Sequence, residues 1–251
     1  MSTIQLANMN GEPEIFYSIQ GEGMNIGVPC IFIRLSLCNL YCKWCDTAYT
    51  WNWTKTTFVH DLDTVDSAYK FDKKQAIISK TNDQIIELLK QYNCKHVVIT
   101  GGEPLVQHKV LTNLLKTLKE KGYYIEVETN GTIIPNRICA SYFDQFNVSI
   151  KLSNSQVDTD DRIIPSAITY FIKDTRSNFK FVIDSKEDLQ EVIELIKTYS
   201  IPKHSVFLMP QAIQKETLHQ KRGWLIEQCK ILGVRYTDRL HVEVYGDKRG
   251  V

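Results

Sequence analysis

The stretch CIFIRLSLCNLYCKWC, residues 30–45, decides the fold prediction, because an apolar strand candidate runs directly into three closely spaced cysteines. Its first seven residues form the β-branched and aromatic run that is typical of a buried strand. Cys38, Cys42 and Cys45 follow on the loop after that strand. Each iron of a 4Fe-4S cluster takes one cysteine, so three thiolates leave one iron open to an outside ligand. A metal centre with an open position is usually catalytic.

The same three cysteines leave other hypotheses open. A zinc site needs a fourth ligand, and no second CxxC or HxxxH pair accompanies the six histidines and the remaining cysteines, Cys30, Cys94, Cys139 and Cys229. Disulfides need an oxidising compartment, whereas the opening MSTIQLANMN has no signal segment and predicts a reducing, cytoplasmic location. Three buried, unligated cysteines are the remaining alternative, and the other four cysteines are interpreted as small core hydrophobes.

Composition predicts one globular domain over residues 1–251. The chain is 43% hydrophobic and 24% charged, which is ordinary for a single sizeable core. A net charge of +1 gives no bulk attraction to nucleic acid or to an anionic membrane, and no apolar run approaches the roughly 20 residues of a membrane span. We therefore expect neither nucleic acid nor membrane as a partner.

Strand and helix patterns alternate along the whole chain. The strand candidates are residues 30–36, 95–100, 123–129, 146–152, 179–184, 204–210 and 239–245. The helix candidates are residues 85–92 after a Thr81 and Gln84 capping box, 106–121 before Gly122, 185–199 capped by Asp184, and 215–232 before Gly233. This alternation predicts an α/β fold with a parallel sheet and right-handed crossovers. About six main parallel strands fall short of the eight of a closed barrel, which favours an incomplete, partial TIM-type barrel over a complete barrel or a doubly wound layer.

Unusual loops follow four of these strands. The cysteine loop, GGEP (residues 101–104), ETNGT (residues 128–132) and residues 151–154 all stand at carboxyl ends, where parallel α/β folds bind ligands. GGEP in isolation is most simply a tight turn, but its glycines would let a ligand approach the backbone. Glu103 is a candidate acceptor for the ammonium group of an amino acid, and Glu128 is a candidate for ribose hydroxyls.

Two further segments carry candidate ligand groups. The glycine-rich loop over residues 17–29 is either a flexible turn or a binding loop, in which Gln20 and Glu22, with Arg34 downstream, suit a polar heterocycle bearing an acid group. Asp46 and Thr47 offer oxygen atoms either for loop hydrogen bonds or for a hard cation such as Mg2+. The tail RLHVEVYGDKRGV follows a predicted strand and either frays or folds back to the ligand face.

The ordered set of motifs resembles one family. CxxxCxxC followed by GGEP resembles the radical S-adenosylmethionine (SAM) superfamily, and YSIQGEG, CNLYCKWCDT, TGGEPL, ETNGT, LMPQ and YGDKRGV together resemble its 7-carboxy-7-deazaguanine synthases. The resemblance covers nearly the whole chain. Two departures are Ile150, where the family often has proline, and Asp247, where it commonly has asparagine.

The resemblance implies a role for each matching residue. Cys38, Cys42 and Cys45 would ligate a 4Fe-4S cluster, and Thr47 would ligate Mg2+. SAM would contact Trp44, Cys45, Asp46, Gly102, Glu128, Ser149 and Lys151. The substrate would contact Ile19, Gln20, Gly21, Glu22, Arg34, Thr100 and the carboxylate of Val251.

The resemblance also implies a reaction. One electron enters the cluster from a flavodoxin- or ferredoxin-like donor, and the resulting 5'-deoxyadenosyl radical abstracts hydrogen from 6-carboxy-5,6,7,8-tetrahydropterin. The pterin ring contracts to 7-carboxy-7-deazaguanine with loss of ammonia, in queuosine and deazapurine biosynthesis, and the enzyme is expected to be a homodimer. Another radical SAM enzyme, such as a glycyl-radical activase, and a non-catalytic iron-sulfur electron-transfer module remain alternatives. Residues 51–80 are interpreted as a surface insertion, with a lid, a dimer contact or a donor-docking surface as other possibilities.

Overall fold

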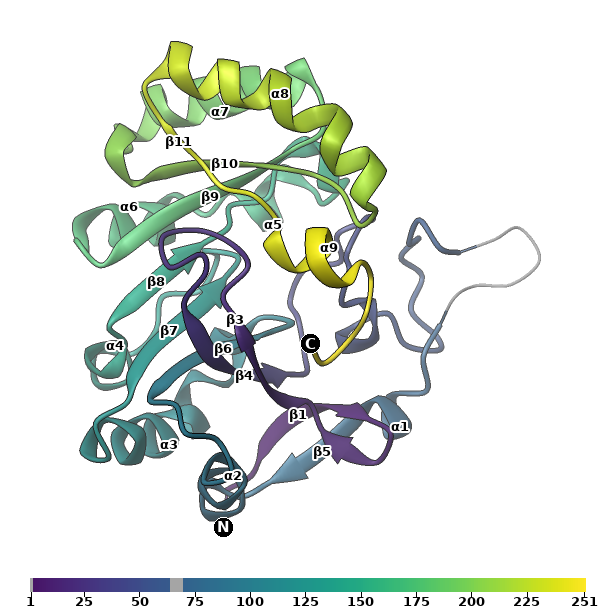
Figure 1. The fold of residues 1–251 in the computed structure, drawn as a ribbon, viewed down its shortest axis with the longest axis vertical. Coiled ribbons are helices and arrows are strands. Elements are labelled where there is room, and N and C mark those ends of the chain that lie inside the picture. Colours follow the sequence, from purple (N-terminus) through teal and green to yellow (C-terminus); the bar gives the residue numbers. More distant parts are fainter. Residues whose placement is uncertain (1, 64–69) are drawn as a thin grey trace.

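The computed structural model describes residues 2–63 and 70–251, and its core is a mostly parallel sheet with helices on one side (Figure 1). The hydrogen-bonded path runs β11-β10-β9-β8-β7-β6-β4-β1-β2. Neighbours from β4 to β11 pair in parallel. These strands are β4 (Pro29–Leu35), β6 (His96–Gly101), β7 (Tyr124–Thr129), β8 (Gln145–Val148), β9 (Ser177–Ile183), β10 (Val206–Pro210) and β11 (Arg235–Tyr236). The predicted α/β fold with a mostly parallel sheet is therefore confirmed.

Antiparallel strands extend the sheet beyond β4. β1 (Ile4–Met9) pairs with β4, β2 (Glu12–Pro13) and β5 (Ile77–Lys80), and β3 (Ile15–Ile19) pairs with β4. These short strands were not predicted. The prediction of a surface insertion over residues 51–80 is wrong for its last four residues, because Ile77–Lys80 pair with β1 in the sheet.

Helices connect the strands. The longer ones are α2 (Asn82–Leu89), α3 (His108–Glu120), α6 (Pro165–Lys173), α7 (Lys186–Tyr199) and α8 (Lys215–Leu232). The shorter ones are α1 (Lys73–Ala76), α4 (Arg137–Tyr142), α5 (Thr159–Arg162) and α9 (Leu240–Tyr245), with 3-10 turns at Ala48–Thr50, Pro104–Gln107, Ser153–Ser155 and Lys203–Ser205. Within the described residues, no helix is both long and apolar enough to cross a membrane.

The two faces of the parallel sheet carry opposite chemistry, because successive side chains of a strand point to opposite sides. One face is apolar and packs in the main core against α3, α6, α7 and α8; its members include Ile33, Val127, Phe146, Phe181 and Leu208. The residues between them in sequence are largely polar or charged and form the opposite face, including Arg34, Glu126, Glu128, Asn147 and Lys180. The sheet thus builds its core on one side and leaves a polar hollow on the other.

The helix boundary signals were mostly correct. Thr81 and Gln84 form the predicted capping box of α2. Gly122 and Gly233 follow α3 and α8 with φ of 75° and 67°, a conformation that favours glycine. The prediction that Asp184 caps α7 was wrong, because Ser185 accepts from the N–H of Asp188 and forms a capping box with it.

The predicted strand over residues 239–245 was wrong, because Leu240–Tyr245 form the helix α9. Alternating valine and charged residues favour a strand locally, but tertiary contacts override that preference. Val242 packs against Ala212 and Leu218 in a small apolar cluster. The carboxylate of Glu243 pairs with Lys215 and Arg222 of α8 and contacts the His219 ring of the same helix.

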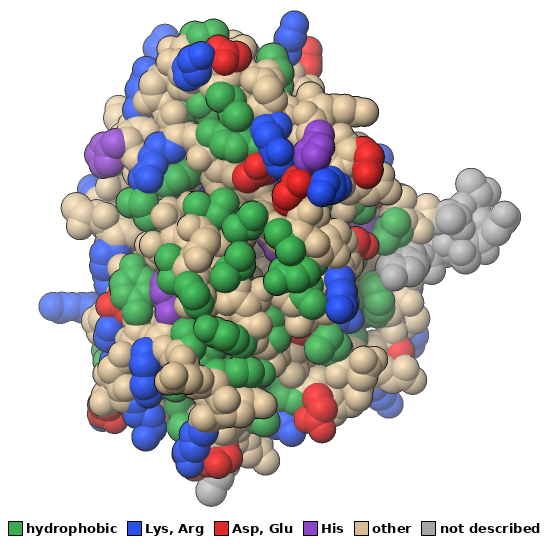
Figure 2. Space-filling model, in the orientation of Figure 1, with side chains coloured by type: hydrophobic (Ala, Val, Ile, Leu, Met, Phe, Trp, Pro, Cys, Tyr) green, Lys and Arg blue, Asp and Glu red, His purple; other side chains and the backbone are tan. Residues whose placement is uncertain are grey.

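Hydrophobic side chains gather near the middle of the face shown in Figure 2, with charged side chains around them. The exposed large hydrophobic residues of the chain include Tyr17, Met24 and Ile26 around the loop between β3 and β4, and Val244 and Tyr245 in α9. The homodimer expected from the sequence stays a prediction.

Candidate active site

A cavity of about 280 Å³ opens on the polar side of the sheet, where the parallel strands end. Every residue for which the family resemblance implies a role lines this one cavity, from Ile19 in β3 to Val251 in the tail. The prediction that the unusual loops lie together on one face is therefore confirmed, because residues of each loop line this cavity. Which ligand each residue contacts stays a prediction.

The cysteine loop forms an apolar corner of the cavity. Cys42 packs with Leu40 and Val157, and Cys38 and Cys45 pack against the same cluster. Burial raises the pKa of all three thiols, that of Cys42 to about 12, so without a bound cation they are neutral at physiological pH. Within residues 2–63 and 70–251, no three His, Cys, Asp or Glu side chains converge as ligands of a single ion. A cluster spreads its cysteines over separate irons, so it does not require such convergence.

The glycines of GGEP allow the loop after β6 to lie against the cysteine loop. Gly101 has a φ of +119°, and a Cβ there would lie 2.0 Å from the carbonyl oxygen of Leu35. A Cβ at Gly102 would lie 2.2 Å from the carbonyl oxygen of Leu37 and 3.1 Å from the Cβ of Cys38. The two glycines are needed for this close backbone approach beside the first cysteine.

Glu103 holds two loops together and is not the free acceptor for an ammonium group that we expected. Its Oε1 accepts from the Leu105 N–H and the Thr129 hydroxyl, both at 2.9 Å, and its Oε2 accepts from the Asn130 N–H at 2.6 Å. The residue is fully buried and is not among those that line the cavity. It joins GGEP to ETNGT and so positions the cavity wall.

The ionisation of Glu103 should make the stability of the protein pH-dependent. Burial raises its pKa from 4.5 to about 7, although its three hydrogen bonds and Lys151 oppose that rise. Because the folded-state pKa is the higher one, its contribution to stability is complete below about pH 4.5 and is lost as the pH rises through 7. We expect a loss on the order of 3 kcal/mol across this window, measured by urea unfolding. Glu103→Gln should remove this part of the pH slope; an identical slope in both proteins would contradict the assignment.

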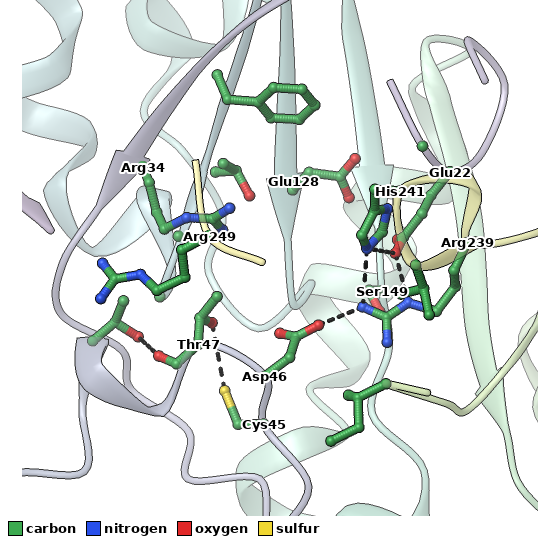
Figure 3. Close-up of a pocket in the computed structure, with 18 of the residues that line it drawn as sticks. Glu22, Arg34, Cys45, Asp46, Thr47, Glu128, Ser149, Arg239, His241 and Arg249 are labelled. Atoms are coloured by element: carbon green, nitrogen blue, oxygen red, sulfur yellow. Dashed lines mark hydrogen bonds and ion pairs between the residues drawn. The ribbon is translucent and has the colours of Figure 1, made fainter. Parts of the chain in front are cut away.

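Two cations and three carboxylates that line the cavity form an ion network. Figure 3 shows the part of it in which Arg239 lies between Glu22 and Asp46. Glu22 accepts from Lys180 at 2.5 Å and from Arg239 at 3.0 Å, and Arg239 also reaches Asp46 at 2.5 Å. Burial would raise the pKa of Glu22, but Lys180 and Arg239 outweigh burial and keep the pKa well below its usual range. Lys180 is 7% exposed and also donates to Glu128 at 3.0 Å. The network therefore joins three loop residues, Glu22, Asp46 and Arg239, to Glu128 in β7 and Lys180 in β9.

Two amide side chains, those of Gln20 and Asn147, connect Glu128 to a second glutamate, Glu126. Asn147 donates to Glu128 at 3.0 Å and to Glu126 at 2.7 Å, and the amide of Gln20 lies 3.4 Å from each carboxylate. His96 contacts Glu126 at 2.5 Å. Burial raises the pKa of Glu128, reinforced by the negative charges of Glu22 and Glu126 and opposed by Lys180. The positive charge of Lys180 therefore favours the ionised form of Glu128.

Arg34 is oriented by a buried carboxylate. Glu14 is fully buried and accepts from the Nε of Arg34 at 2.8 Å, from the Tyr49 hydroxyl at 3.2 Å, and from Arg249 at 2.5 Å. The Arg249 guanidinium also lies 3.6 Å from the centre of the Tyr49 ring. One carboxylate therefore positions both Arg34 and the tail, which lines the cavity through residues 246–251.

On the far side of the cavity, Lys151 donates to the Ser149 hydroxyl at 3.0 Å and lies 5.6 Å from the Trp44 ring. Thr47 has its hydroxyl 3.5 Å from the sulfur of Cys45. Trp44, Ser149 and Lys151 thus share the wall that the resemblance implies for SAM.

The described part of the segment 51–80 packs against the cysteine loop. His60 Nε2 lies 2.8 Å from the carbonyl oxygen of Cys45, and the Phe58 ring stacks on Tyr41. Residues 64–69, where part of the expected insertion falls, lie outside the described residues. The segment therefore supports the cysteine loop in addition to any role at the surface.

Sequence reasoning missed four residues that shape the cavity: Glu14, Lys180, Arg239 and His241. Lys180 carried a usable signal, because it stands between Phe179 and Phe181 in a strand pattern and so points to the opposite face. Arg239 and His241 were hidden by the wrong strand assignment. His241 packs so closely that a Cβ at Gly21 would lie 2.3 Å from its Nδ1.

Comparison with known proteins agrees with this geometry. The family model of the radical SAM superfamily matches residues 33–220. The 7-carboxy-7-deazaguanine synthase of Rhodopirellula baltica is 32% identical over 249 residues, covering 94% of this chain and 87% of the relative. The synthase of Pyrobaculum aerophilum is 33% identical over 238 residues, with 94% and 95% coverage. The solved structure of QueE from Escherichia coli matches with a TM-score of 0.69 and 26% identity over 95% of each chain.

The superfamily match spans the cysteine loop, GGEP and ETNGT, and the curated relatives align over nearly the whole chain. The chain therefore belongs to the radical SAM superfamily and, within it, to the family of 7-carboxy-7-deazaguanine synthases.

Proposed function

We propose that this protein converts 6-carboxy-5,6,7,8-tetrahydropterin to 7-carboxy-7-deazaguanine with loss of ammonia, in the biosynthesis of queuosine and other deazapurines. The observation that carries the proposal is the single cavity in which the cysteine loop faces Arg34 on one side and the ion network of Glu22, Lys180 and Glu128 on the other. The curated relatives that align with it carry the name of this activity.

The cysteine loop is suited to a 4Fe-4S cluster. Its three cysteines pack in one apolar cluster. Gly101 and Gly102 have no side chain, so only their backbone lies beside the cysteine loop at Cys38. The cluster supplies the one-electron reduction of SAM that starts the radical reaction. Cys38, Cys42 and Cys45 would hold it. Trp44, Ser149, Lys151 and Glu128 would hold SAM.

The protein's share of the reaction is to bind, orient and shield the substrate. The hydrogen bond from Arg34 Nε to Glu14 orients the guanidinium, whose terminal nitrogens are proposed to bind the substrate carboxylate. Glu22 stays ionised between Lys180 and Arg239, so it can accept hydrogen bonds from N–H groups of the pterin. Gln20, held below by Glu126 and Glu128, adds an amide to the same recognition surface.

Mg2+ is proposed to bind at Thr47, together with oxygen atoms of the substrate. The neighbouring carboxylate of Asp46 is paired with Arg239, so of these two adjacent residues it is Thr47 whose hydroxyl is proposed to bind the cation. Omitting Mg2+ should therefore raise the substrate KM more than it affects SAM binding.

We further propose that the sheet is a partial barrel of about six main parallel strands, as the superfamily comparison supports. A flavodoxin- or ferredoxin-like electron donor, a homodimer and a cytoplasmic location stay predictions.

The two departures from the family pattern lie in different places. Ile150 is buried, with 2% of its surface exposed, and Asp247 lines the cavity.

The function is tested by anaerobic incubation of the reconstituted, reduced protein with SAM, Mg2+ and the carboxytetrahydropterin. We expect 7-carboxy-7-deazaguanine and ammonia in equal amounts, detected by mass spectrometry and an ammonia assay. Cleavage of SAM without this product would instead indicate another radical SAM enzyme. A reducible cluster without any SAM cleavage would indicate an electron-transfer module.

Arg249→Ala should weaken substrate binding, because it releases the tail from Glu14 and Tyr49. Arg249 is partly exposed and Glu14 keeps Arg34, so we expect little change in Tm. The KM for the pterin should rise about tenfold, as expected for the loss of one charge-assisted contact, with a smaller effect on kcat. Arg137→Ala, at an exposed arginine of α4, is the matched control. An unchanged KM for Arg249→Ala would show that the tail does not shape the bound state.

A further inference from the structure

Three tryptophans lie on the cysteine loop and just after it, and one of them differs from the others. The indole N–H of Trp44 donates to the carbonyl oxygen of Asn154 at 3.0 Å, and that of Trp53 donates to the carbonyl oxygen of Tyr49 at 3.2 Å. Trp51 is only 5% exposed, yet its Nε1 has no hydrogen-bond partner among the described residues. Buried polar groups without a partner are rare in folded proteins, and each calls for a physical explanation.

The position of Trp51 supplies a candidate acceptor. Its side chain lines the same cavity as Cys38, Cys42 and Cys45. Its ring lies 6.1 Å from the ring of His60, which itself contacts the carbonyl oxygen of Cys45. Trp51 is therefore held in the corner occupied by the third cysteine.

The acceptor is absent from the bare protein. Trp51 and Cys45 line the same cavity, yet the indole N–H makes no hydrogen bond to the Cys45 thiol. A neutral thiol is a weak acceptor, whereas a thiolate or sulfide of a cluster is a charged one.

We propose that the indole N–H of Trp51 donates a hydrogen bond to a sulfur of the 4Fe-4S cluster at Cys45 and thereby raises the reduction potential of the cluster. This inference rests on the cluster that the proposed function requires. Trp51 acts through the cluster and is therefore a positioning residue, which touches neither the pterin nor the reacting bond.

The direction of the effect follows from charge. One-electron reduction adds a negative charge that is shared by the cluster sulfurs, so a donor to one of them stabilises the reduced form more than the oxidised form. Hydrogen bonds to the sulfurs are among the factors that set the potentials of iron-sulfur clusters. Without this donor, the cluster should become harder to reduce.

The test compares Trp51 with Trp53 in the full-length, anaerobically reconstituted protein. Trp51→Phe removes the N–H but also shortens the ring, so a second variant carries benzothienylalanine at position 51, which keeps the ring system and replaces N–H by sulfur. The same two changes at position 53 are the controls, because that N–H donates to a backbone carbonyl and not toward the cluster. Circular dichroism and iron and sulfide content establish that each variant is folded and loaded.

The readout is a redox titration of the cluster followed by electron paramagnetic resonance, without SAM or substrate. At a fixed potential, both Trp51 variants should show an approximately fivefold lower ratio of reduced to oxidised cluster, as expected for one lost hydrogen bond. For a one-electron couple this corresponds to a shift of about 40 mV to lower potential. The Trp53 variants should titrate like the unmodified protein.

The outcomes separate this inference from the proposed function. If the protein with benzothienylalanine at position 51 titrates like the unmodified protein, the proposed hydrogen bond is overturned, but the proposal of a 4Fe-4S cluster is not. A shift of equal size at position 53 would also overturn it, because a general packing effect would then explain both. If the unmodified protein holds no 4Fe-4S cluster after reconstitution, it is the proposed function that fails.

Discussion

Cys42→Ala is expected to abolish formation of 7-carboxy-7-deazaguanine, by at least about a thousandfold, while the chain remains folded. A cluster that loses one of its three ligands is not held in the orientation that exposes its open iron. The fold should survive, because the neutral thiol of Cys42 packs only with a small apolar cluster. Turnover, iron content and the absorbance of the reconstituted cluster measure the effect.

Cys139→Ala is the matched control for the cluster variant. Cys139 is fully buried in the main hydrophobic core, so the substitution removes the same sulfur atom and leaves a comparable cavity. We expect both variants to lose a similar amount of stability, about 1 kcal/mol, and only Cys42→Ala to lose the cluster. A Cys42→Ala protein that retains the 4Fe-4S spectrum and turnover would overturn the assignment of this ligand.

Lys180→Met is expected to destabilise the protein by about 3 kcal/mol at pH 8 and to reduce turnover by about a hundredfold or more. The ammonium group of Lys180 is buried between Glu22 and Glu128, so its removal leaves buried carboxylates facing each other. Glu22 keeps Arg239, whereas the cation that opposes the raised pKa of Glu128 is lost. Glu128 should then bind a proton near neutral pH.

The pH dependence and a double variant test this explanation. The pKa of Glu128 in the folded variant lies above its unfolded value, so stability should be recovered at low pH and lost as the pH rises through the folded pKa. Lys180→Met combined with Glu128→Gln should restore most of the lost unfolding free energy at pH 8. Urea unfolding at pH 5.5 and pH 8 measures both effects. If the double variant is as unstable as Lys180→Met, the loss arises from packing and not from unpaired charge.

The sequence predicted the parts of the site that are encoded locally. The cysteines, GGEP and ETNGT each follow a strand pattern, and parallel strands bring their carboxyl ends to one edge, so their convergence follows from the fold class. The capping box of Thr81 and Gln84 was predictable for the same reason, because both partners lie within one turn of chain.

The parts that were missed depend on partners far away in sequence. The pattern of residues 239–245 favours a strand, but buried Arg239 pairs with Glu22 and Asp46 in the cavity wall, and the residues after it form a helix. Glu14 gave no local sign that it would bind Arg34 and Arg249 at once. The prediction that Glu103 accepts from a ligand ammonium group was wrong. The sequence of the loop does not show that the backbone N–H groups of Leu105 and Asn130 already donate to this carboxylate.

The contacts that close the cavity also have a consequence for how the protein folds. Strands β6 to β10 are neighbours both in sequence and in the sheet, so they can assemble progressively through short crossovers. The cavity wall instead joins Gly23 to Thr237, Glu22 to Arg239 and Glu14 to Arg249, pairs separated by 214, 217 and 235 residues. Closing loops of that length costs entropy before the contacts can compensate, which slows their formation. The sheet is therefore expected to fold first, and the active site to assemble in the last step, when the two ends of the chain meet.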